Sequence, residues 1–516
     1  RKECNVKLAT LKSVITIDRD DPLTEDARIG VYKEKDLFYT SGDNKDLTPI
    51  ATSTYENIIQ AAYVNGNFVD DTRRAYTYYY AGDTLYYGRT WAHFVTEAPE
   101  EFSVDNIDSK EDLAWLISYV NGLNDSDPHP KAVATLTADV NMGAHYWKPL
   151  GIAEEGGCEN GFLGTFDGGW HTIDSLVIRR EGFRNLGLFD NVSSHDGDSA
   201  LVKNVLLHSA VIKPWNPASD TREQYVGGIA GTVAGGGTIV GCLAAPTLNA
   251  TEANTSTYMG GVAGRVESGG IVHSVIGLPT LEGYYMGGLV GKIETGGMLL
   301  NSYSNIASVT TMSESHGGGG LVGYNSGTVE NCYSRLQQTT EPDPSHFGWF
   351  VGTNSGTVSH CYAPTGKTTY VYSGESPTGH GNYGEPIDRK AIGYLYDDNK
   401  VTLAAGQSND YHSDVITYAS GRIDKWPGMV SALNHWVSEK NAITNTSDPY
   451  YNKDFTPWFR PTTSQLNVDL PVLGLTEFNS MAALHSDSLT LHYGTLDGLL
   501  TDFNAKNVET SLFLYG

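Results

Sequence analysis

With 516 residues, the chain is long enough to bury a large core, and its length suggests two to four domains. Its 58 glycines, its 31 tyrosines and its low share of charged residues, 18%, are typical of a β-rich, turn-dense protein rather than a helical bundle. A net charge of −26 argues against nucleic acid or an anionic membrane surface as the main partner. Five cysteines are too few for a disulfide scaffold, and their odd number leaves at least one thiol free.

The N-terminal region, residues 1–104, has a pattern of its own. Alternating segments such as AYTYYYAGDTLYYG at 75–88 predict a separate small β domain. No apolar run reaches the roughly 18 residues of a membrane-spanning helix, and no signal peptide stands at Arg1. We expect a mature or trimmed chain. Cys4 lacks the small and apolar residues that precede a lipidated cysteine, so a lipid anchor would have been lost with the trimmed segment.

The segment SKEDLAWLISYVNGL at 109–123 predicts one amphipathic helix. Ser109 is a suitable N-cap, acidic residues fill the first turn, and apolar residues recur at 113, 116, 117 and 120. We expect this helix to cover the first edge of the repeat array that follows, because an open parallel edge recruits other strands.

An internal repeat dominates the middle of the chain. We interpret three segments as opening coils: 138–178, NLGLFDNV and LVKNVLLHSAVI. Regular glycine motifs then start at 227, 260, 287, 319 and 348, in steps of 33, 27, 32 and 29 residues. Second blocks, anchored on Cys242, Ser274, Ser302, Cys332 and Cys361, step by 32, 28, 30 and 29 residues. Two short alternating strands per unit of about 30 residues are typical of a stacked solenoid with parallel pairing. The fold prediction is therefore all-β, a right-handed parallel β-helix over 105–475.

After residue 365 the repeats fade. AIGYLYDD and SALNHWVSE predict irregular loops with a short helix, and LNVDLPVLGL at 466–475 predicts a last coil or a closing strand. Residues 476–516 are strand-like, and we expect them to belong to another domain or to a partner.

The units at 319–334 and 348–363 resemble the Glug repeat, whose pattern is roughly GGLVG-x-N-x-GTI-x-N-C-Y-S. The segment FLGTFDGGWHTIDSLVI resembles the opening of such β-helices in surface proteins of Bacteroidetes and Firmicutes, except that Gly169 and Trp170 replace an Asn-Gly pair, so that this turn is expected to be remodelled. The resemblance covers about 138–365 and implies a fold more than a function. Glug repeats also occur in immunoglobulin-A metallopeptidases, outside the catalytic module, but none of the 15 histidines here forms the H-E-x-x-H motif.

The glycine loops do not predict phosphate binding. A Walker loop needs G-x-x-x-x-G-K-[ST] before a helix, whereas β-alternating residues follow the glycines here. Cys332 and Cys361 fall in one column of adjacent coils, about 4.8 Å apart. We favour buried thiols over a disulfide, since stacked side chains rarely have the torsion a disulfide needs.

Charged and aromatic residues on the repeats form the candidate ligand site. The strands GRVESG and GKIETG place Arg265 over Lys292 and Glu267 over Glu294 on the outer face, with Val266 and Ile293 inside. A solvated lattice of weak ion pairs is one interpretation, and part of a carbohydrate groove is the other. The aromatic candidates that the repeat register places nearby, either as sugar-stacking surfaces or as loop anchors, are Tyr284, Tyr285, Tyr324, His346 and Trp349.

An enzyme on the same scaffold is the alternative, either a polysaccharide lyase or a glycoside hydrolase. Its acids and bases would come from Glu330, Glu341, Asp343, His316 and His346. No cofactor is expected other than calcium, for which DRDD at 18–21 and NDSDP at 124–128 are candidates, although neither has EF-hand spacing.

The sequence favours a non-enzymatic binding protein that faces outward on a bacterial outer membrane, an adhesin or an accessory glycan-binding lipoprotein. Its expected partner is an extracellular glycan or a surface protein. A third alternative is a structural subunit of a surface complex, in which the terminal strand SLFLYG docks a partner.

Overall fold

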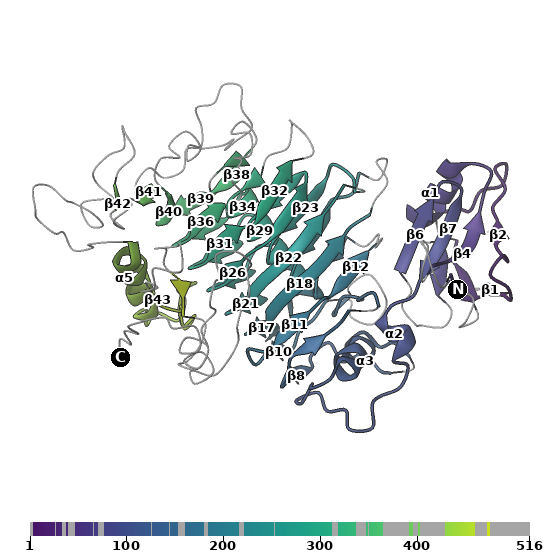
Figure 1. Ribbon diagram of the computed structural model, residues 1–516, viewed down its shortest axis with the longest axis horizontal. Coiled ribbons are helices and arrows are strands. Elements are labelled where there is room, and N and C mark those ends of the chain that lie inside the picture. Colours follow the sequence, from purple (N-terminus) through teal and green to yellow (C-terminus); the bar gives the residue numbers. More distant parts are fainter. Residues whose placement is uncertain are drawn as a thin grey trace, which may run out of the picture.

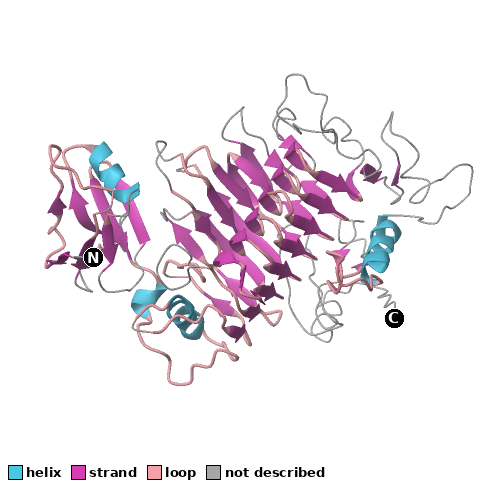
Figure 2. Cartoon of the chain, turned by 180° about the vertical axis from the view of Figure 1, so that it is seen from behind, coloured by secondary structure: helices cyan, strands magenta, loops and turns pink. Residues whose placement is uncertain are grey.

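The architecture is given by a computed structural model of the whole chain (Figures 1 and 2). The residues it describes are 4–364, 392–395, 401–402, 429–459 and 472–474, apart from 26, 34–37, 40–46, 65–66, 71–76, 125, 144, 153–159, 180–183, 216–220, 252, 312–317, 337–346 and 349. The predicted C-terminal segment 476–516 therefore lies outside the described residues, as do His316, Glu341, Asp343, His346 and Trp349.

The N-terminal region forms two small sheets and one helix with a core of their own. One sheet is parallel and has the order β1 (Cys4–Leu8), β3 (Ile29–Lys33), β5 (Phe68–Asp70); the other has the order β2 (Ile15–Thr16), β4 (Leu47–Thr52), β7 (Thr84–Gly88), β6 (Thr77–Ala81). Helix α1 (Glu56–Val64) was not predicted; its Ile59 and Ala62 are buried in this core with Val31, Ile50 and Tyr87. These sheets stand at one end of the molecule (Figure 1).

Two helices connect these sheets to the first coils. Helix α2 (Trp91–Phe94) packs against α3 (Lys110–Asn121), where the sequence predicts a helix. The Ser109 side chain caps α3 by accepting the Asp112 amide, and Gly122 ends the helix with φ of 69°. The apolar face of α3 and the side chain of Trp91 join the core of the first coils, so this end of the array is covered.

Between α3 and the C-terminal segment that starts at residue 429, the described chain is a parallel β-solenoid, as predicted. Each regular coil contains four or five short strands on four faces, rather than the predicted two strands, and the chain passes the faces in the order face 1, face 2, face 3, face 4. Face 1 contains β13 (Asn185–Leu186), β19 (Gln224–Gly227), β23 (Thr257–Gly260), β28 (Tyr285–Gly287), β33 (Gly318–Gly319) and β37 (Phe347–Gly348). Face 2 contains β14 (Phe189–Val192), β20 (Ala230–Val233), β24 (Ala263–Val266), β29 (Val290–Ile293), β34 (Val322–Asn325) and β38 (Val351–Asn354).

Faces 3 and 4 are longer because they start in the opening coils. Face 3 contains β8 (Val133–Thr135), β10 (Thr165–Asp167), β17 (Leu201–Lys203), β21 (Thr238–Val240), β25 (Ile271–His273), β30 (Met298–Leu300), β35 (Thr328–Glu330) and β39 (Thr357–Ser359). Face 4 contains β9 (Val140–Asn141), β11 (Thr172–Asp174), β12 (Val177–Arg179), β18 (Leu206–Lys213), β22 (Leu243–Asn249), β26 (Ile276–Gly277), β27 (Thr280–Gly283), β31 (Tyr303–Ile306), β32 (Ser308–Thr311), β36 (Tyr333–Leu336), β40 (Cys361–Pro364), β41 (Ile392–Leu395) and β42 (Val401–Thr402). A small hairpin, β15 (Ser194–His195) with β16 (Asp198–Ser199), projects after face 2.

The glycine motifs form the bend between faces 1 and 2. A Cβ atom on Gly260 would lie 2.1 Å from the carbonyl oxygen of Ala263, so only glycine fits this bend. Inside the coils, Cys242, Val275, Ser302, Cys332 and Cys361 share one column, as the pairing of the following residues shows. The prediction that placed Ser274 in this column was wrong by one residue, because a coil of 33 residues is followed by one of 27. Cys332 and Cys361 are free, buried thiols, as expected, and Cys242 is a free, buried thiol as well.

Ser274 belongs instead to the corner between faces 3 and 4. The residues at this corner all have positive φ, between 48° and 63°, and we call them the corner ladder: Asn204, Gly241, Ser274, Asn301, Asn331 and His360. Asparagine suits the left-handed conformation better than other side chains do. In the opening coils, Gly169 and Trp170, between β10 and β11, also have positive φ, 56° and 62°.

A C-terminal segment, which we call the strap (residues 429–459), packs against the side of the solenoid. It consists of helix α5 (Met429–Asn441), a series of turns and strand β43 (Trp458–Phe459), which pairs with β44 (Val472–Leu473). Thus the stretch predicted as a last coil or closing strand pairs with the strap. The strap buries Leu433, Trp436, Phe455 and Trp458 against the outer side chains of Ile276, Leu300, Tyr303 and Tyr333.

Candidate functional site

Outer side chains of faces 1 and 2 converge across the glycine bend. On face 1, Tyr225, Tyr258 and Tyr285 occupy one register position in successive coils and stack, with ring centroids 5.9 and 4.5 Å apart. On face 2 the matching outer row contains Arg265, Lys292 and Tyr324. The strands hold both rows at a fixed spacing because each outer residue is followed by a buried one, such as Val266 or Ile293.

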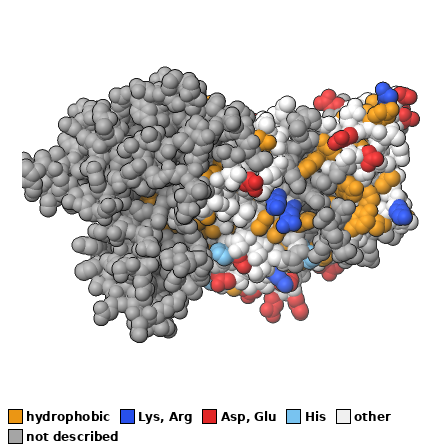
Figure 3. Space-filling model, turned by 45° about the horizontal axis from the view of Figure 1, so that its top comes forward, with side chains coloured by type: hydrophobic (Ala, Val, Ile, Leu, Met, Phe, Trp, Pro, Cys, Tyr) orange, Lys and Arg blue, Asp and Glu red, His pale blue; other side chains and the backbone are white. Residues whose placement is uncertain are grey.

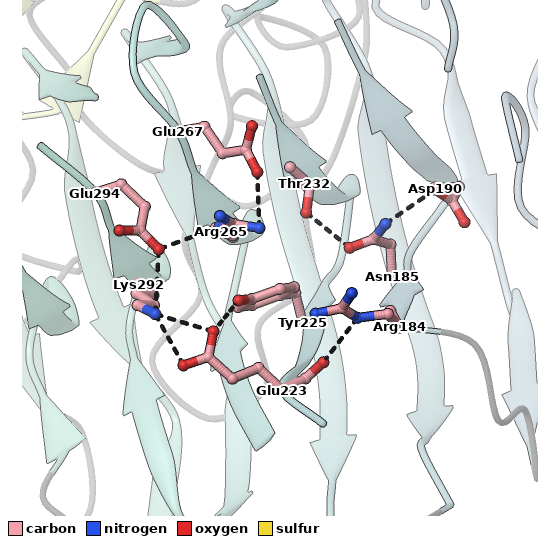
Figure 4. Close-up of polar contacts among 10 residues, drawn as sticks. All are labelled: Arg184, Asn185, Asp190, Glu223, Tyr225, Thr232, Arg265, Glu267, Lys292 and Glu294. Carbon is pink, nitrogen blue, oxygen red and sulfur yellow. Dashed lines mark hydrogen bonds and ion pairs between the residues drawn. The ribbon is translucent and has the colours of Figure 1, made fainter. Parts of the chain in front are cut away.

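The two cations of face 2 bind carboxylates from both faces (Figure 4). Lys292 Nζ lies 2.9 and 3.0 Å from the two oxygens of Glu223, and 3.1 Å from Glu294 Oε1. Arg265 lies 2.7 Å from Glu267 Oε1 and 3.3 Å from the same Glu294 oxygen. Glu294 is therefore shared between the two cations. We call this set the tyrosine–ion lattice: Glu223, Tyr225, Tyr258, Arg265, Glu267, Tyr285, Lys292, Glu294 and Tyr324.

The cations also lie over the tyrosine rings. Arg265 is 4.7 Å from the ring centre of Tyr225, and Lys292 is 5.0 Å from that of Tyr258 and 6.0 Å from that of Tyr324. These are the distances of cation–π contacts. The faces of Tyr225 and Tyr258 are therefore engaged by neighbouring rings and by the lattice's own cations, which restricts their use as sugar-stacking surfaces.

The surroundings in the lattice change the pKa values of Glu223, Tyr225 and Tyr258. Burial raises the pKa of Glu223, but the hydrogen bond that Tyr225 donates to it, together with the hydrogen bond and charge of Lys292, outweighs burial and lowers that pKa below its ordinary value. Burial, and then the hydrogen bond to Glu223, raises the pKa of Tyr225. Burial, and then the charge of Glu223, raises the pKa of Tyr258. At neutral pH the carboxylate is therefore ionised and the tyrosines keep their hydroxyl protons.

The structure brings most of the predicted ligand residues together. Arg265, Glu267, Lys292, Glu294, Tyr285 and Tyr324 all belong to the lattice, and the predicted pairing of Arg265 with Lys292 is confirmed. Tyr284 is partly exposed and directly precedes Tyr285 on face 1, whereas His346 and Trp349 lie outside the described residues. The predicted ion-pair interpretation is supported by the distances, but the solvation is lower than expected: Lys292 is only 13% exposed.

Sequence reasoning missed Glu223, Tyr225 and Tyr258. Glu223 stands one residue before β19, outside the glycine motif, and reaches Lys292 from 69 residues away. A usable signal was the tyrosine at a fixed distance before three successive glycine pairs, at 225, 258 and 285.

Figure 3 shows basic, acidic and hydrophobic side chains interspersed on the face of the molecule that this view presents. No segregated patch of one charge is visible among the described side chains there, in keeping with charges that are paired locally.

Of the residues considered for catalysis, Glu330 is the one that the structure describes. Its Oε1 accepts a hydrogen bond from Ser359 and its Oε2 one from Tyr450 of the strap. Oε1 thus links two neighbouring strands of face 3 and Oε2 holds the strap to that face, which makes Glu330 a structural contact here.

Neither predicted calcium segment gathers a ligand set among its described residues. In the first segment, the Asp18 side chain accepts a hydrogen bond from the amide of Asp20. In the second, the Asn124 side chain donates to the carbonyl of Ala92 and to the hydroxyl of Ser118. In the described part of the chain no three histidine, cysteine or acidic side chains are arranged to hold a metal ion. Nor does any helix described there have the length and apolar character needed to cross a membrane.

Comparisons with known proteins do not show a family for this chain. No family model matches the chain, and no curated protein sequence matches it. The chain is structurally similar to a solved protein from Bacteroides ovatus that is provisionally described as an immunoglobulin A1 protease; the match covers 72% of this chain and 92% of that one, with 17% identity and a TM-score of 0.41.

Proposed function

We propose that this chain is a Glug-type cell-surface binding protein of a Bacteroidetes-like bacterium, an adhesin or an accessory glycan-binding lipoprotein. In this proposal it faces outward from the outer membrane and holds an extracellular glycan on the tyrosine–ion lattice. The Glug-like units and the acidic chain support this assignment, and the lattice supports the location of the site.

The observation that carries the proposal is that the side chains of the lattice hold each other in fixed positions. Nine polar or aromatic side chains from three successive coils and one flanking coil are tied to each other on an outer surface. Recognition sites need side chains whose positions are fixed before the ligand arrives, because ordering them afterwards reduces affinity. Stacked rings and shared ion pairs fix these side chains, and the rigid strands fix the distance between coils.

A glycan array with the full chain tests the proposal, followed by product analysis on every glycan that binds. We expect binding without cleavage. New reducing ends or unsaturated uronides would favour the enzyme alternative, and an array without any bound glycan would contradict the proposal.

A matched pair of variants then tests the location. Tyr285→Ala is expected to weaken binding about tenfold, because it removes a ring at the end of the tyrosine stack. Tyr451→Ala, on the exposed strap surface, should leave binding unchanged. Equal affinities for the two variants would place the site elsewhere.

A further inference from the structure

The strap hides a histidine of face 3. His273 is the last residue of β25, and only 2% of it is exposed. Val240 and Leu300 occupy its register position on the two neighbouring strands, and its ring meets Phe455 of the strap edge to face at 5.2 Å. Surroundings of this kind disfavour the charged form of an imidazole. Because Phe455 belongs to the strap, these surroundings exist only while the strap is docked.

The hydrogen bonds next to His273 fit a neutral ring. Ser274 Oγ accepts hydrogen bonds from Asn301 Nδ2 and from the backbone amide of Thr456 in the strap, each 3.1 Å long. A hydroxyl has two lone pairs and one proton, so its proton is left for His273 Nδ1, 3.4 Å away. This network assigns the Nε2-protonated tautomer to the neutral ring. A proton on Nδ1 would instead set two donors against each other at the hydroxyl that holds Thr456.

The charges around His273 also oppose its protonation. Lys453 of the strap is the charged residue whose field acts on the ring, and it disfavours a second positive charge there. In the outer row of face 3, Lys203 and Glu330 lie two strands away on either side; Lys203 is paired with a carboxylate of its own face, and both oxygens of Glu330 accept hydrogen bonds. Among the described residues, no ion pair joins the ring to any other charged side chain of the strap: Glu439, Lys440, Asp448 and Asp454. An imidazolium under the docked strap would therefore meet a like charge and no counter-ion.

From this arrangement we propose that the strap is an acid-released cover, and that protonation of His273 frees it from a solenoid that stays folded. Release lets the ring meet water, where an imidazole takes up a proton near pH 6.5. Since the proton binds to the released form in preference to the docked form, docking is strongest above pH 6.5 and weakens as the pH falls. The inference is independent of the proposed function, because the strap lies on faces 3 and 4 and the lattice on faces 1 and 2.

The interface beneath the strap is suited to opening. It contains two buried polar atoms that have no protein partner among the described residues, Trp436 Nε1 of the strap and Asn331 Oδ1 of the corner ladder. Buried polar groups without a protein partner contribute less to docking than paired ones do. Release would uncover apolar side chains on the outside of the solenoid: Ile276, Leu300, Tyr303 and Tyr333.

One proton sets the size of the effect. We define the opening constant as the ratio of released to docked strap. If the released ring titrates at 6.5 and the docked ring stays neutral, the opening constant rises about tenfold between pH 7.5 and pH 5.5. Carboxylates titrate near pH 4, so they stay largely ionised over this range.

Hydrogen exchange of the full chain at pH 7.5, 6.5 and 5.5, corrected for the intrinsic pH dependence of amide exchange, measures the opening constant. Amides of α5 report on the strap, and amides of β17 and β21 report on the solenoid. The same measurements in low concentrations of urea show whether the opening is local, because a local opening exposes little surface and responds weakly to urea. We expect α5 to open more readily than the reference strands, with a weak response to urea and the tenfold pH effect.

Two replacements of the histidine and one matched control assign the effect. His273→Leu copies Leu300 of the next coil, and His273→Asn keeps a neutral acceptor beside Ser274. In both variants the opening constant should change less than about twofold between pH 7.5 and pH 5.5. His195→Leu, on the exposed hairpin, removes a histidine outside the strap and should keep the tenfold change.

Three results would overturn the inference. A pH effect of equal size in a folded His273 variant would assign the response to other groups. An opening constant of the unsubstituted chain that stays constant from pH 7.5 to pH 5.5 would show that acid does not release the strap. Equal opening constants and equal urea responses for α5 and the reference strands would show that the strap does not open by itself. The last two comparisons need no variant, and none of the three uses a glycan, so they are separate from failure of the proposed function.

Discussion

Lys292 is a lysine side chain kept largely out of water on the outer surface of a solenoid. Removing an ammonium group from water costs free energy, and three carboxylate contacts together with three tyrosine rings offset that cost. Because the partners come from face 1 and face 2, the lysine also ties the two faces together across the glycine bend. Its loss would leave Glu223 as a partly buried charge without its ion-pair partner and Glu294 with Arg265 alone.

Lys292→Met is therefore expected to lower the free energy of unfolding by about 1–3 kcal/mol, less than the full value for a buried pair because the site is partly exposed. Urea denaturation followed by circular dichroism measures this change. Lys203→Met is the matched control: Lys203 contacts Asp167 at 3.0 Å but is 36% exposed, so its replacement should cost less than about 1 kcal/mol. Equal costs for both variants would mean that the lattice does not act as a unit.

His273 titrates in an unusual environment under the strap. It lies between Val240 and Leu300 on face 3, and its ring meets Phe455 edge to face at 5.2 Å. Burial, and then the charge of Lys453, lowers the pKa of His273 from 6.5 to about 3. The folded chain thus keeps this imidazole neutral over a range of pH in which the unfolded chain protonates it.

Between pH 6.5 and about 3 the unfolded state binds more protons at this position, so the free energy of unfolding falls as pH is lowered. The contribution of His273 is about 1.4 kcal/mol per pH unit. His273→Leu, which copies Leu300 at the same register position one coil on, should make the pH dependence shallower by that amount. His195→Leu, at an exposed site, should not. Urea denaturation at pH 7, 6, 5 and 4 gives the slopes, and parallel slopes for all three chains would contradict the assignment.

The strap is fastened to the solenoid by the corner ladder. Asn301 donates to the carbonyl of Thr456 and accepts from the indole of Trp458, while Ser274 accepts the amide of Thr456. Asn331 donates to the carbonyl of Leu433 in α5. Because the left-handed corner turns each of these side chains outward at one-coil spacing, the ladder offers the strap a row of hydrogen-bonding groups. Tyrosine rings directly beyond the corner supply the apolar contact.

Trp458 is the apolar centre of this contact, 5.9 and 5.5 Å from the rings of Tyr303 and Tyr333. Trp458→Ala is expected to cost the docked strap about 3–5 kcal/mol. Hydrogen exchange should then increase in residues 429–459, while the coils that contain β17 and β21 keep their protection. A matched exposed change, Tyr451→Ala, should leave exchange unaltered. Equal loss of protection along the solenoid would mean that the strap is part of one cooperative unit.

At the scale of elements, the sequence predicted the solenoid because glycine pairs and small residues recur where bends and packing demand them. It did not predict the four faces of each coil, since most of their strands have two to four residues, too few to show an alternating pattern. Ser274 was assigned to the wrong column because neighbouring coils differ in length. The pairing of Leu243 with Ile276 shows that Val275 takes this place instead. The position of the strap could not be predicted from the sequence, because Asn301 and Thr456 are 155 residues apart and no local pattern encodes their contact.

The candidate site was predictable to the extent that it repeats. Arg265 and Lys292 occupy equivalent positions of two repeats, so their stacking followed from alignment alone. Glu223 could not be placed in this way, because it precedes the strand and its partner lies two coils away. The low exposure of Lys292 depends on the angle between faces 1 and 2, which is a property of the folded coil.

At the scale of the whole molecule, the N-terminal sheets contact the solenoid through a tryptophan of the solenoid itself. Strand β18 is the longest strand of face 4, and Trp215 follows its end by two residues. The Trp215 indole packs edge to face against Tyr80 of β6 at 4.5 Å and joins the edge of the N-terminal core. This core is small and separate from that of the solenoid, and a small domain buries a lower fraction of its surface than a large one. A contribution of one aromatic side chain is therefore a sizeable part of its stability.

Trp215→Ala should lower the stability of the N-terminal sheets by about 1–2 kcal/mol and leave the solenoid unchanged. Two thermal transitions are expected, of which only the lower one moves, since the coils are stabilised by their neighbours rather than by the N-terminal sheets. Differential scanning calorimetry measures both, and limited proteolysis should cut residues 4–88 earlier in the variant. Trp170→Ala is the matched comparison, because it removes a tryptophan that belongs to the solenoid alone. This tryptophan packs near Gly241 on the solenoid's corner, where a Cβ would lie 3.4 Å from its ring, so its loss should move the upper transition instead. If both replacements moved both transitions together, the sheets and the solenoid would unfold as one body, and Trp215 would transmit stability between them rather than only join them.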